Sequence, residues 1–574
     1  MANPDGIIVF FFVQSSGGGL LLQGNVLFIV NWQKVEKSTF IISLNNTYSN
    51  DELYSSIIDV KSKSKTHFQF TDVNKDISFI VFQMHSHLNN ISMRNETCFN
   101  NNKSNRTCEI LTGMNIGLFS TMPISDMSVT NLNEKDLKIL IAVHGYIYDD
   151  PVPGGCNLDG PVEIPPFVST TTSPYRDYIS VTAPAPSPSL APDMCEQTLQ
   201  SLTFYRLYLP ERDFSMDSYF GGIKAMMSYP SVLKYGDEIP ETHRSNVRRT
   251  MSAYPGTGVV FVAVALFRNY NGTANPIPRW STYVPTVTYV CSPLVEDDCL
   301  LLGDLLSQVL CASLLFVGLF VCYFGHKFFK TEMFMFGMLS GVIITYILIS
   351  LIAEMEQAPL IGASFLSGIL FGFIWLTFWW FYGIPVFSVL LVTLTFGFFA
   401  ACVLYHQIPG GLTMLLEDLN FWTLFILVML LTAVILTPAT YPANILCCAV
   451  LGAYAAIYPI DYCLGSNLKY IIINTVRRAT VDKFHYAVLS PPFEKNDALL
   501  ILLWVMLAIT GFLFQHYHNR GKPPFPPPPR NIRESPEGYG SITPYTRYVV
   551  SYYGIYPFTP PPRNIREIIR HLVR

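Results

Sequence analysis

Residues 305–324 read LLSQVLCASLLFVGLFVCYF, a run that contains no charged side chain. The hydrocarbon core of a bilayer is about 30 Å thick, and a helix needs about 20 apolar residues to cross it. Helix is the required form because lipid offers no hydrogen-bond partner to backbone N–H and C=O groups. This stretch therefore predicts a transmembrane helix and sets the class of fold, a membrane protein.

Further apolar runs follow the first one along the chain, and several of the links between them are only a few residues long. Short links make neighbouring helices antiparallel. We expect an all-α bundle of seven transmembrane helices over residues 301–514. Its remaining helices are predicted at residues 333–352, 360–380, 386–405, 421–437, 443–461 and 498–514.

Small side chains recur at a spacing of four residues in two of these runs. In lipid, such stripes let two helices approach each other closely. We expect them to pack helices within the chain, with dimerisation as the alternative. The stripe residues are Gly337 and Gly341 in the second run and Ser364, Gly368 and Gly372 in the third.

The chain before residue 301 is rich in Asn, Ser, Thr and Pro and has only short apolar stretches. Segments 259–267 and 283–289 are β-branched and aromatic, and Gly, Pro and Asn bound them, which is typical of strands. We expect a β-rich domain over residues 31–300. His85 and His87 share one face of another predicted strand; without a nearby third ligand they indicate a solvated strand end rather than a metal site.

Asn-x-Ser/Thr sequons all lie in this first part of the chain, and none follows residue 300. A sequon is glycosylated only where the chain meets the secretory lumen, so this distribution indicates a lumenal or extracellular domain. The acceptor residues are Asn45, Asn90, Asn95, Asn102, Asn105 and Asn271.

Six of the 12 cysteines also precede the first apolar run. An even set in a polar segment suits disulfides in an oxidising compartment. Buried free thiols are the alternative. The expected pairs join neighbours along the chain: Cys98 with Cys108, Cys156 with Cys195, and Cys291 with Cys299.

The two ends of the chain differ from its middle. Residues 6–13 form a short apolar core, but no Lys or Arg precedes it, which is a weak signal-peptide pattern. We assign residues 1–30 to a signal or processing segment. Residues 515–574 are rich in Pro, Arg and Tyr, and we expect a disordered cytoplasmic tail there.

Basic residues around the apolar runs predict the orientation. Lys327, Lys330, Arg520 and Lys522 follow the first and last runs, which places the C-terminus in the cytoplasm and the N-terminus outside. Residues 464–497 conflict with this rule, because they lie outside and still carry several basic residues. We expect an interfacial amphipathic element there. The basic residues are Lys469, Arg477, Arg478, Lys483 and Lys495.

No catalytic pattern is evident in the sequence. It contains no His-Glu-x-x-His, nucleophile elbow or phosphate loop. Asp461 is the one ionisable residue inside the predicted helices, where such residues usually mark function. The formal net charge of -4 gives no indication of nucleic-acid binding. We expect a non-enzymatic protein of the lipid bilayer, without a cofactor or a metal.

Several long strings resemble the transmembrane 7 superfamily member 3 family. They appear in the family's order and cover roughly residues 75–527. The resemblance implies a multi-pass protein of the plasma membrane, with the endoplasmic reticulum or endosomes as alternatives, that supports cell survival and restrains the unfolded protein response. The strings are FIVFQMHSH (79–87), DPVPGGCNL (150–158), FGHKFFKTEMF (324–334), NILCCAVLGAY (444–454), FEKNDALLILLWVMLAITG (493–511) and RGKPPFPP (520–527).

Two other functions remain open from the sequence. A channel or transporter could conduct through cavities lined by Ser, Thr and backbone groups. An orphan seven-helix receptor would need an extracellular ligand, whose identity the sequence leaves unknown. A G-protein-coupled receptor is disfavoured because the third run ends in Trp379-Trp380-Phe381-Tyr382 instead of an acidic-Arg-Tyr triplet.

The tail contains a candidate adaptor motif. The string FPPPP is the core of ligands for EVH1 domains, which bind polyproline II helices in aromatic grooves. The octapeptide PPPRNIRE occurs at 527–534 and again at 560–567. We expect an EVH1-type adaptor, with a basic tail near anionic lipid as the alternative. The motif residues are Phe525, Pro526, Pro527, Pro528 and Pro529.

The sequon distribution leads to a first prediction. When the chain is expressed in cells, enzymatic removal of N-glycans should increase its electrophoretic mobility, because the sequons face the lumen. Asn90→Gln should remove one step of that shift, whereas Asn444→Gln, which belongs to no sequon, should remove none. An unshifted chain whose tag before Leu301 is reached by cytosolic protease would contradict the predicted orientation.

Overall fold

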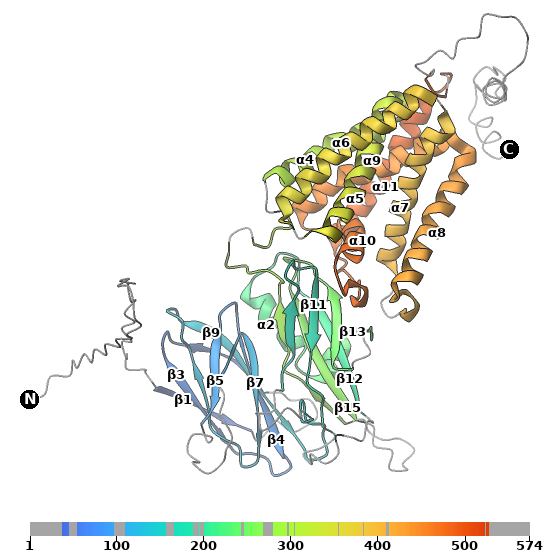
Figure 1. The fold of residues 1–574 in the computed structure, drawn as a ribbon. Coiled ribbons are helices and arrows are strands. Elements are labelled where there is room, and N and C mark those ends of the chain that lie inside the picture. The colour runs from blue at the N-terminus through green and yellow to red at the C-terminus, as the bar shows by residue number, and fades with distance from the viewer. Residues whose placement is uncertain are drawn as a thin grey trace, which may run out of the picture.

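The computed structural model describes residues 37–44, 54–96, 110–156, 166–187, 195, 200–242, 246–267, 279–295, 298–302, 305–353, 355–382, 384–408, 412–522 and 524–526. A β-rich part and a bundle of long helices lie end to end (Figure 1). The β-rich part holds two sandwiches, each with its own buried core. The predicted fold class, a β-rich region followed by apolar helices, is confirmed.

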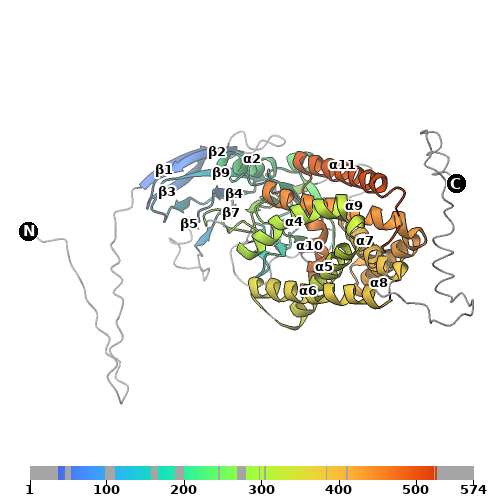
Figure 2. The ribbon, with the colours of Figure 1, turned by 90° about the horizontal axis from the view of Figure 1, so that it is seen from above.

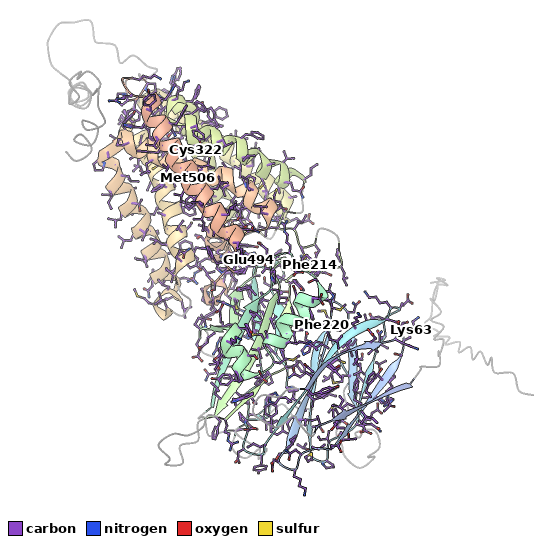
Figure 3. The ribbon with its side chains drawn as sticks, turned by 180° about the vertical axis from the view of Figure 1, so that it is seen from behind. Lys63, Phe214, Phe220, Cys322, Glu494 and Met506 are labelled. Carbon is purple, nitrogen blue, oxygen red and sulfur yellow. A yellow bond between two sulfur atoms is a disulfide. The ribbon has the colours of Figure 1, made fainter. Side chains whose placement is uncertain are left out.

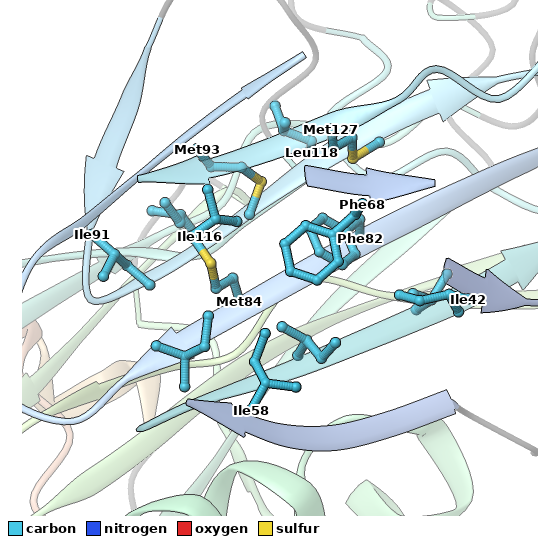
Figure 4. Packing of buried hydrophobic residues seen from close by; sticks show 14 of the residues in the cluster. Ile42, Ile58, Phe68, Phe82, Met84, Ile91, Met93, Ile116, Leu118 and Met127 are labelled. Atoms are coloured by element: carbon cyan, nitrogen blue, oxygen red, sulfur yellow. The ribbon is translucent and has the colours of Figure 1, made fainter. Parts of the chain in front are cut away.

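The first sandwich places a sheet of order β1-β3-β8-β5-β6 over a sheet of order β2-β9-β4-β7. Phe68, Phe82 and Met84 lie between the sheets and are fully buried (Figure 4). The strands of this sandwich are β1 Lys37–Ser43, β2 Tyr54–Val60, β3 Lys65–Thr71, β4 Phe79–Ser86, β5 Ile91–Asn95, β6 Leu111–Gly113, β7 Asn115–Thr121, β8 Met127–Thr130 and β9 Leu137–Tyr146.

The second sandwich places the sheet β10-β11-β14 over a sheet built on the long antiparallel pair β12–β15. Two short helices, α2 and α3, cover the outer face of the larger sheet. The elements are β10 Ser169–Thr172, β11 Tyr178–Thr182, β12 Gln200–Tyr208, α2 Met216–Ala225, α3 Tyr229–Tyr235, β13 Asp237–Ile239, β14 Arg248–Ser252, β15 Val259–Phe267, β16 Arg279–Thr282 and β17 Thr286–Thr288.

The two sandwiches share a buried junction. Leu140 of β9 packs with Tyr219 and other apolar residues of the second sandwich. His85 at the end of β4 is fully buried there and lies 2.9 Å from Asn115 Oδ1, which also accepts the Tyr219 hydroxyl. The expectation of a solvated strand end at His85 was wrong, because the second sandwich covers that end. Burial lowers the pKa of His85 to about 4.

The bundle is built from long apolar helices whose outward faces expose side chains such as Leu348, Ile374 and Leu427. Viewed from above, α11 and α6 lie on opposite edges of the bundle (Figure 2). The helices are α4 Leu305–Phe324, α5 Phe329–Ile352, α6 Gln357–Tyr382, α7 Pro385–Gln407, α8 Asp418–Leu436, α9 Thr440–Leu464 and α11 Lys495–His518, with the short α10 Tyr470–Thr480 before α11.

Six helical segments among the described residues are long and apolar enough to cross a membrane. The longest, Asp418–Leu464, contains α8 and α9, separated by a 3-10 turn at Thr437–Ala439. Asp418 pairs with Arg478 of α10, which lies beside the second sandwich (Figure 1), and the Cys463 carbonyl accepts from Arg212 of that sandwich, so both ends of this segment face the sandwiches. The segment therefore runs away from the sandwiches and returns. The count of seven crossings stays a prediction, which this reversal supports.

The small-residue stripe lies where α5 meets α6. A Cβ on Gly337 would lie 3.0 Å from the Cα of Gly372, and a Cβ on Gly341 would lie 3.0 Å from the Cα of Gly368. Ser364 is buried, and its hydroxyl donates to the Leu360 carbonyl. The stripe therefore brings two backbones of the same chain together, which is the intramolecular packing that the spacing suggested.

Two disulfides are present among the described residues, Cys156–Cys195 and Cys291–Cys299. Both are expected pairs. The third expected pair, Cys98–Cys108, lies outside the described residues, as do the assigned processing segment and most of the tail. The six described cysteines from Cys311 onward are free, and all but Cys463 are buried.

The helix contact leads to a second prediction. Gly368→Leu should destabilise the bundle by about 1–3 kcal/mol, since the added side chain has no room and its Cβ would meet the Met338 carbonyl oxygen at 2.7 Å. Gly362→Ala in the same helix is the control, because no described atom outside its own helix backbone and chain neighbours lies within 4 Å of its Cβ position. Thermal unfolding in detergent, followed by a thiol-reactive dye on the buried free cysteines, measures both. Equal midpoints for the two variants would contradict the close packing.

Candidate functional site

Among the described residues, the segment between α9 and α11 contacts both the second sandwich and the helix bundle. Residues 465–494, hereafter the docked segment, connect α9 to α11 and include α10. Figure 1 shows α10 between the second sandwich and the bundle. Figure 3 shows Glu494, the last residue of the docked segment, at the sandwich-facing end of α11. This junction is the candidate functional site.

Arg477 of α10 holds the docked segment to the second sandwich. Its side chain is only 7% exposed, and its Nε lies 3.0 Å from Asp177 Oδ1. Its Nη1 donates to the Ala253 carbonyl at 2.8 Å. The guanidinium also lies over the Tyr470 ring. A buried charge needs such compensation, because its desolvation otherwise costs several kcal/mol.

Arg478, the next residue, holds the docked segment to the bundle. Its side chain is 2% exposed and lies 2.8 Å from Asp418 Oδ1. It donates to the carbonyls of Leu415 and Leu416 and lies over the Phe421 ring. Successive residues of a helix point about 100° apart, so α10 presents one arginine to each half of the protein.

The docked segment also extends a sheet of the second sandwich. The Val488 amide donates to the Thr250 carbonyl at 2.9 Å, and the Ser252 amide donates to the Val488 carbonyl at 3.1 Å. These bonds form a parallel bridge between Met251 of β14 and Val488. Main-chain pairing of this kind satisfies an open sheet edge and fixes the docked segment in register.

Residues near the end of the second sandwich make a further set of contacts. The Tyr208 hydroxyl donates to the Ser490 carbonyl at 2.7 Å, and Arg206 hydrogen-bonds the Ser490 hydroxyl. Arg212 donates to the carbonyls of Tyr462 and Cys463 at the end of α9. The second sandwich is thus bound to the bundle at two places as well as through α10.

These contacts explain the basic residues that conflicted with the predicted orientation. Lys469, Arg477 and Arg478 are buried and paired with acidic groups. Lys483 and Lys495 are exposed. The expected amphipathic element exists as α10, but it packs against protein on the sandwich side and the bundle side. Its positive charge therefore serves protein contacts.

Asp461, predicted as an ionisable residue inside a helix, organises the start of the docked segment. It is fully buried and accepts the amides of Leu468 and Lys469 at 3.0 Å. The Lys469 ammonium lies 3.6 Å from it. This arrangement indicates a structural role for Asp461 in turning the chain after α9.

Glu211 of the second sandwich lies near Asp461 and Lys469. Its amide donates to Glu494, and its Oε2 has no partner among the described residues. Burial raises the pKa of Glu211 to about 7; Lys469 lowers it, and the carboxylates of Asp497, Glu494 and Asp461 raise it further. The junction therefore contains a carboxyl group whose pKa lies close to neutral pH.

A second polar group lies at the end of the bundle far from the sandwiches. Asn444 donates to Glu332 Oε2 at 3.1 Å and lies 3.1 Å from His326 Nδ1. Glu332 and Asn444 are fully buried, and Glu332 Oε1 has no partner among the described residues. Glu332 was not predicted as a helix residue, because α5 begins at Phe329, one turn before the apolar run.

The structure describes only some of the other predicted site residues. Asn90 is exposed and Asn95 is half-buried, while the remaining sequons lie outside the described residues. Phe525 of the tail motif was expected to face an adaptor, yet it is only 2% exposed, so an adaptor would have to displace it. Pro526 is described, and Pro527, Pro528 and Pro529 are not.

The contacts at the junction are hydrogen bonds, ion pairs and side-chain packing between the second sandwich and the bundle. Within the described ranges, no group of three or more His, Cys, Asp or Glu side chains is placed to hold a metal ion. The fold and the junction together define a class: multi-pass membrane proteins in which two β-sandwiches are bound to an apolar helix bundle.

Comparison with known proteins identifies the sandwiches and the family. Residues 46–146 match a family model described as TM7SF3-like, N-terminal immunoglobulin-like domain, and residues 151–294 match the second immunoglobulin-like domain of that type. Residues 311–516 match the TM7S3/TM198-like domain.

The chain is 28% identical to human transmembrane 7 superfamily member 3 over 480 residues, which cover 80% of this chain and 81% of the human protein. It is 29% identical to the Rattus norvegicus protein of that name over 475 residues, 80% of this chain and 82% of that protein. The chain belongs to the transmembrane 7 superfamily member 3 family.

The buried ion pair leads to a third prediction. Asp177→Ala should destabilise the protein by about 3–5 kcal/mol, because it leaves the Arg477 charge buried and uncompensated. The matched control is Glu134→Ala, which removes an ion pair between Lys63 and Glu134. The Glu134 side chain is 89% exposed, so this substitution should cost under about 1 kcal/mol. The dye-monitored unfolding midpoint measures both. Similar losses in the two variants would exclude a special role for the junction pair.

The Glu211 carboxyl leads to a fourth prediction. Its pKa rises from the ordinary 4.5 to about 7 in the folded protein, so folding favours its protonated form. The resulting stability is fully present below about pH 4.5 and is lost as pH rises through about 7. Between pH 5 and pH 8 the parent midpoint should therefore fall more steeply than that of Glu211→Gln. Parallel pH profiles for the two proteins would show that this carboxyl is not perturbed.

Proposed function

We propose that the protein acts without catalysis in stress homeostasis of the secretory pathway and in cell survival, as a sensor or scaffold of the membrane. The immunoglobulin-like sandwiches would meet the lumen or the extracellular space, and the tail would meet the cytoplasm. The plasma membrane is the proposed location, with the endoplasmic reticulum or endosomes as alternatives. The resemblance of the chain to the transmembrane 7 superfamily member 3 family supports this role.

The observation that carries the sensor proposal is the position of the two arginines on α10. A ligand can shift an equilibrium only through contacts that differ between two states. Any movement of the second sandwich must move Arg477, because Asp177 and the Ala253 carbonyl hold it. Arg478 on the same helix is held by Asp418 of α8. A change in the sandwiches thus has a direct route to the helices.

The test uses cells that lack the protein and that carry a reporter of the unfolded protein response. After thapsigargin treatment, reporter activity should be higher in these cells than in parental cells, and re-expressed parent chain should restore the lower value. Arg478→Met, expressed at equal surface or membrane abundance, should restore it less than Lys483→Met does. Reporter activity that is unchanged by loss of the protein would contradict the proposed role in stress homeostasis. Equal rescue by the two variants would contradict the proposed role of α10.

A transporter is the second candidate, because of the buried polar group at the far end of the bundle. Ionisable residues inside a membrane helix usually serve ions or protons, and Glu332 is fully buried with a free carboxylate oxygen among the described residues. Liposomes containing purified protein would show ion or proton flux that Glu332→Gln abolishes. Flux that is absent, or unchanged by the substitution, would remove this candidate.

A further inference from the structure

The chain repeats a segment whose first residues, 524–526, lie at the far end of the bundle. Residues 524–534 read PFPPPPRNIRE, and residues 557–567 read PFTPPPRNIRE. The two copies differ at one position, where Pro526 stands in the first and Thr559 in the second. Phe558 therefore takes the place in the second copy that Phe525 takes in the first.

Phe525 occupies a pocket at the end of three helices and the turn before α5. Its ring centroid lies 5.2 Å from that of Phe329 and 5.5 Å from that of His326. The side chain is only 2% exposed, so the pocket encloses it almost completely. The apolar lining is completed by Met333, Trp379 and Val389.

The pocket also offers polar partners for a proline-rich backbone. The His326 ring hydrogen-bonds the backbone of Pro524. The buried Trp379 Nε1 has no hydrogen-bond partner among the described residues. Proline has a carbonyl acceptor and no N–H, and grooves that bind polyproline II segments are lined by aromatic residues. The pocket thus has the chemistry of a receptor for Phe in a proline-rich context.

We propose that this pocket binds either copy of the repeat, and that residues 557–567 compete with residues 524–534 for it. The two residues that dock in the first copy, Pro524 and Phe525, have identical counterparts in Pro557 and Phe558. Phe558 follows Phe525 by 33 residues, and the entropic cost of closing such a loop rises only slowly with its length.

The competition has a consequence for partners. The pocket is filled by a single phenylalanine ring, so docking of one copy excludes the other. The excluded copy then carries an undocked Phe-x-Pro-Pro-Pro string, which suits a domain with an aromatic groove for polyproline II. The tail would present one such ligand at a time while the other copy stays bound to the bundle.

The test measures binding of a labelled peptide of residues 555–569 to the purified full-length protein in nanodiscs. The receptor is the double variant Phe525→Ala/Phe558→Ala, whose pocket is empty, and the dye-monitored midpoint shows that it is folded. Peptide carrying Phe558→Ala should bind at least about tenfold more weakly, because the buried aromatic ring is lost. The parent protein should also bind the peptide at least about tenfold more weakly, since its attached copies occupy the pocket at high effective concentration.

Each other outcome overturns the proposal. Binding of a peptide of residues 522–534 without binding of the second copy would make the pocket specific for the first. Failure of both peptides would show that the pocket is no receptor for the motif. Equal binding to parent and double variant would place the peptide elsewhere. Dimerisation of Phe525→Ala that depends on Phe558, measured by light scattering, would show that the second copy docks on a neighbouring molecule instead.

Discussion

The junction between the second sandwich and the bundle depends on two buried guanidinium groups on one helix. Charges of this kind are expensive to bury, and each remains buried only because a carboxylate and carbonyl oxygens surround it. Arg477 finds these partners on the sandwich and Arg478 finds them on the bundle. Removal of either set would leave a buried charge without compensation. The two halves therefore cannot separate without a large electrostatic cost.

The other contacts of the junction act together with the two buried arginines. The bridge between Met251 and Val488 uses main-chain groups and has little side-chain specificity of its own. The arginines add side-chain specificity, because each pairs with its own carboxylate. Asp461 of α9 and Glu211 of the second sandwich then surround Lys469 at the other side of the junction. Main-chain bonds set the register of the docked segment, and the ion pairs hold α10 to both halves.

Much of the architecture could be predicted from local sequence. The apolar runs predicted the helices, because membrane length and hydropathy are local properties. The four-residue spacing predicted close packing of helices within the chain, and the structure shows it between α5 and α6. The junction could not be predicted, because Asp177 and Arg477 are 300 positions apart and charge counting treats every basic residue as facing solvent or lipid headgroups. Glu332 was missed because helix α5 continues beyond its apolar run. Phe525 was misjudged because the motif is local, whereas the pocket that buries it comes from distant helices.

The disulfide Cys291–Cys299 closes a small ring six residues before α4 begins at Leu305, and Arg176 of the second sandwich holds Asp298 within that ring. The disulfide joins Cys291 directly to Cys299, so a force on the second sandwich extends a shorter length of chain before it reaches α4. A force on the second sandwich would thus reach the bundle by two routes, through this disulfide-closed ring and through α10. Cleavage of the ring's disulfide by a reductant would lengthen only the first of these routes.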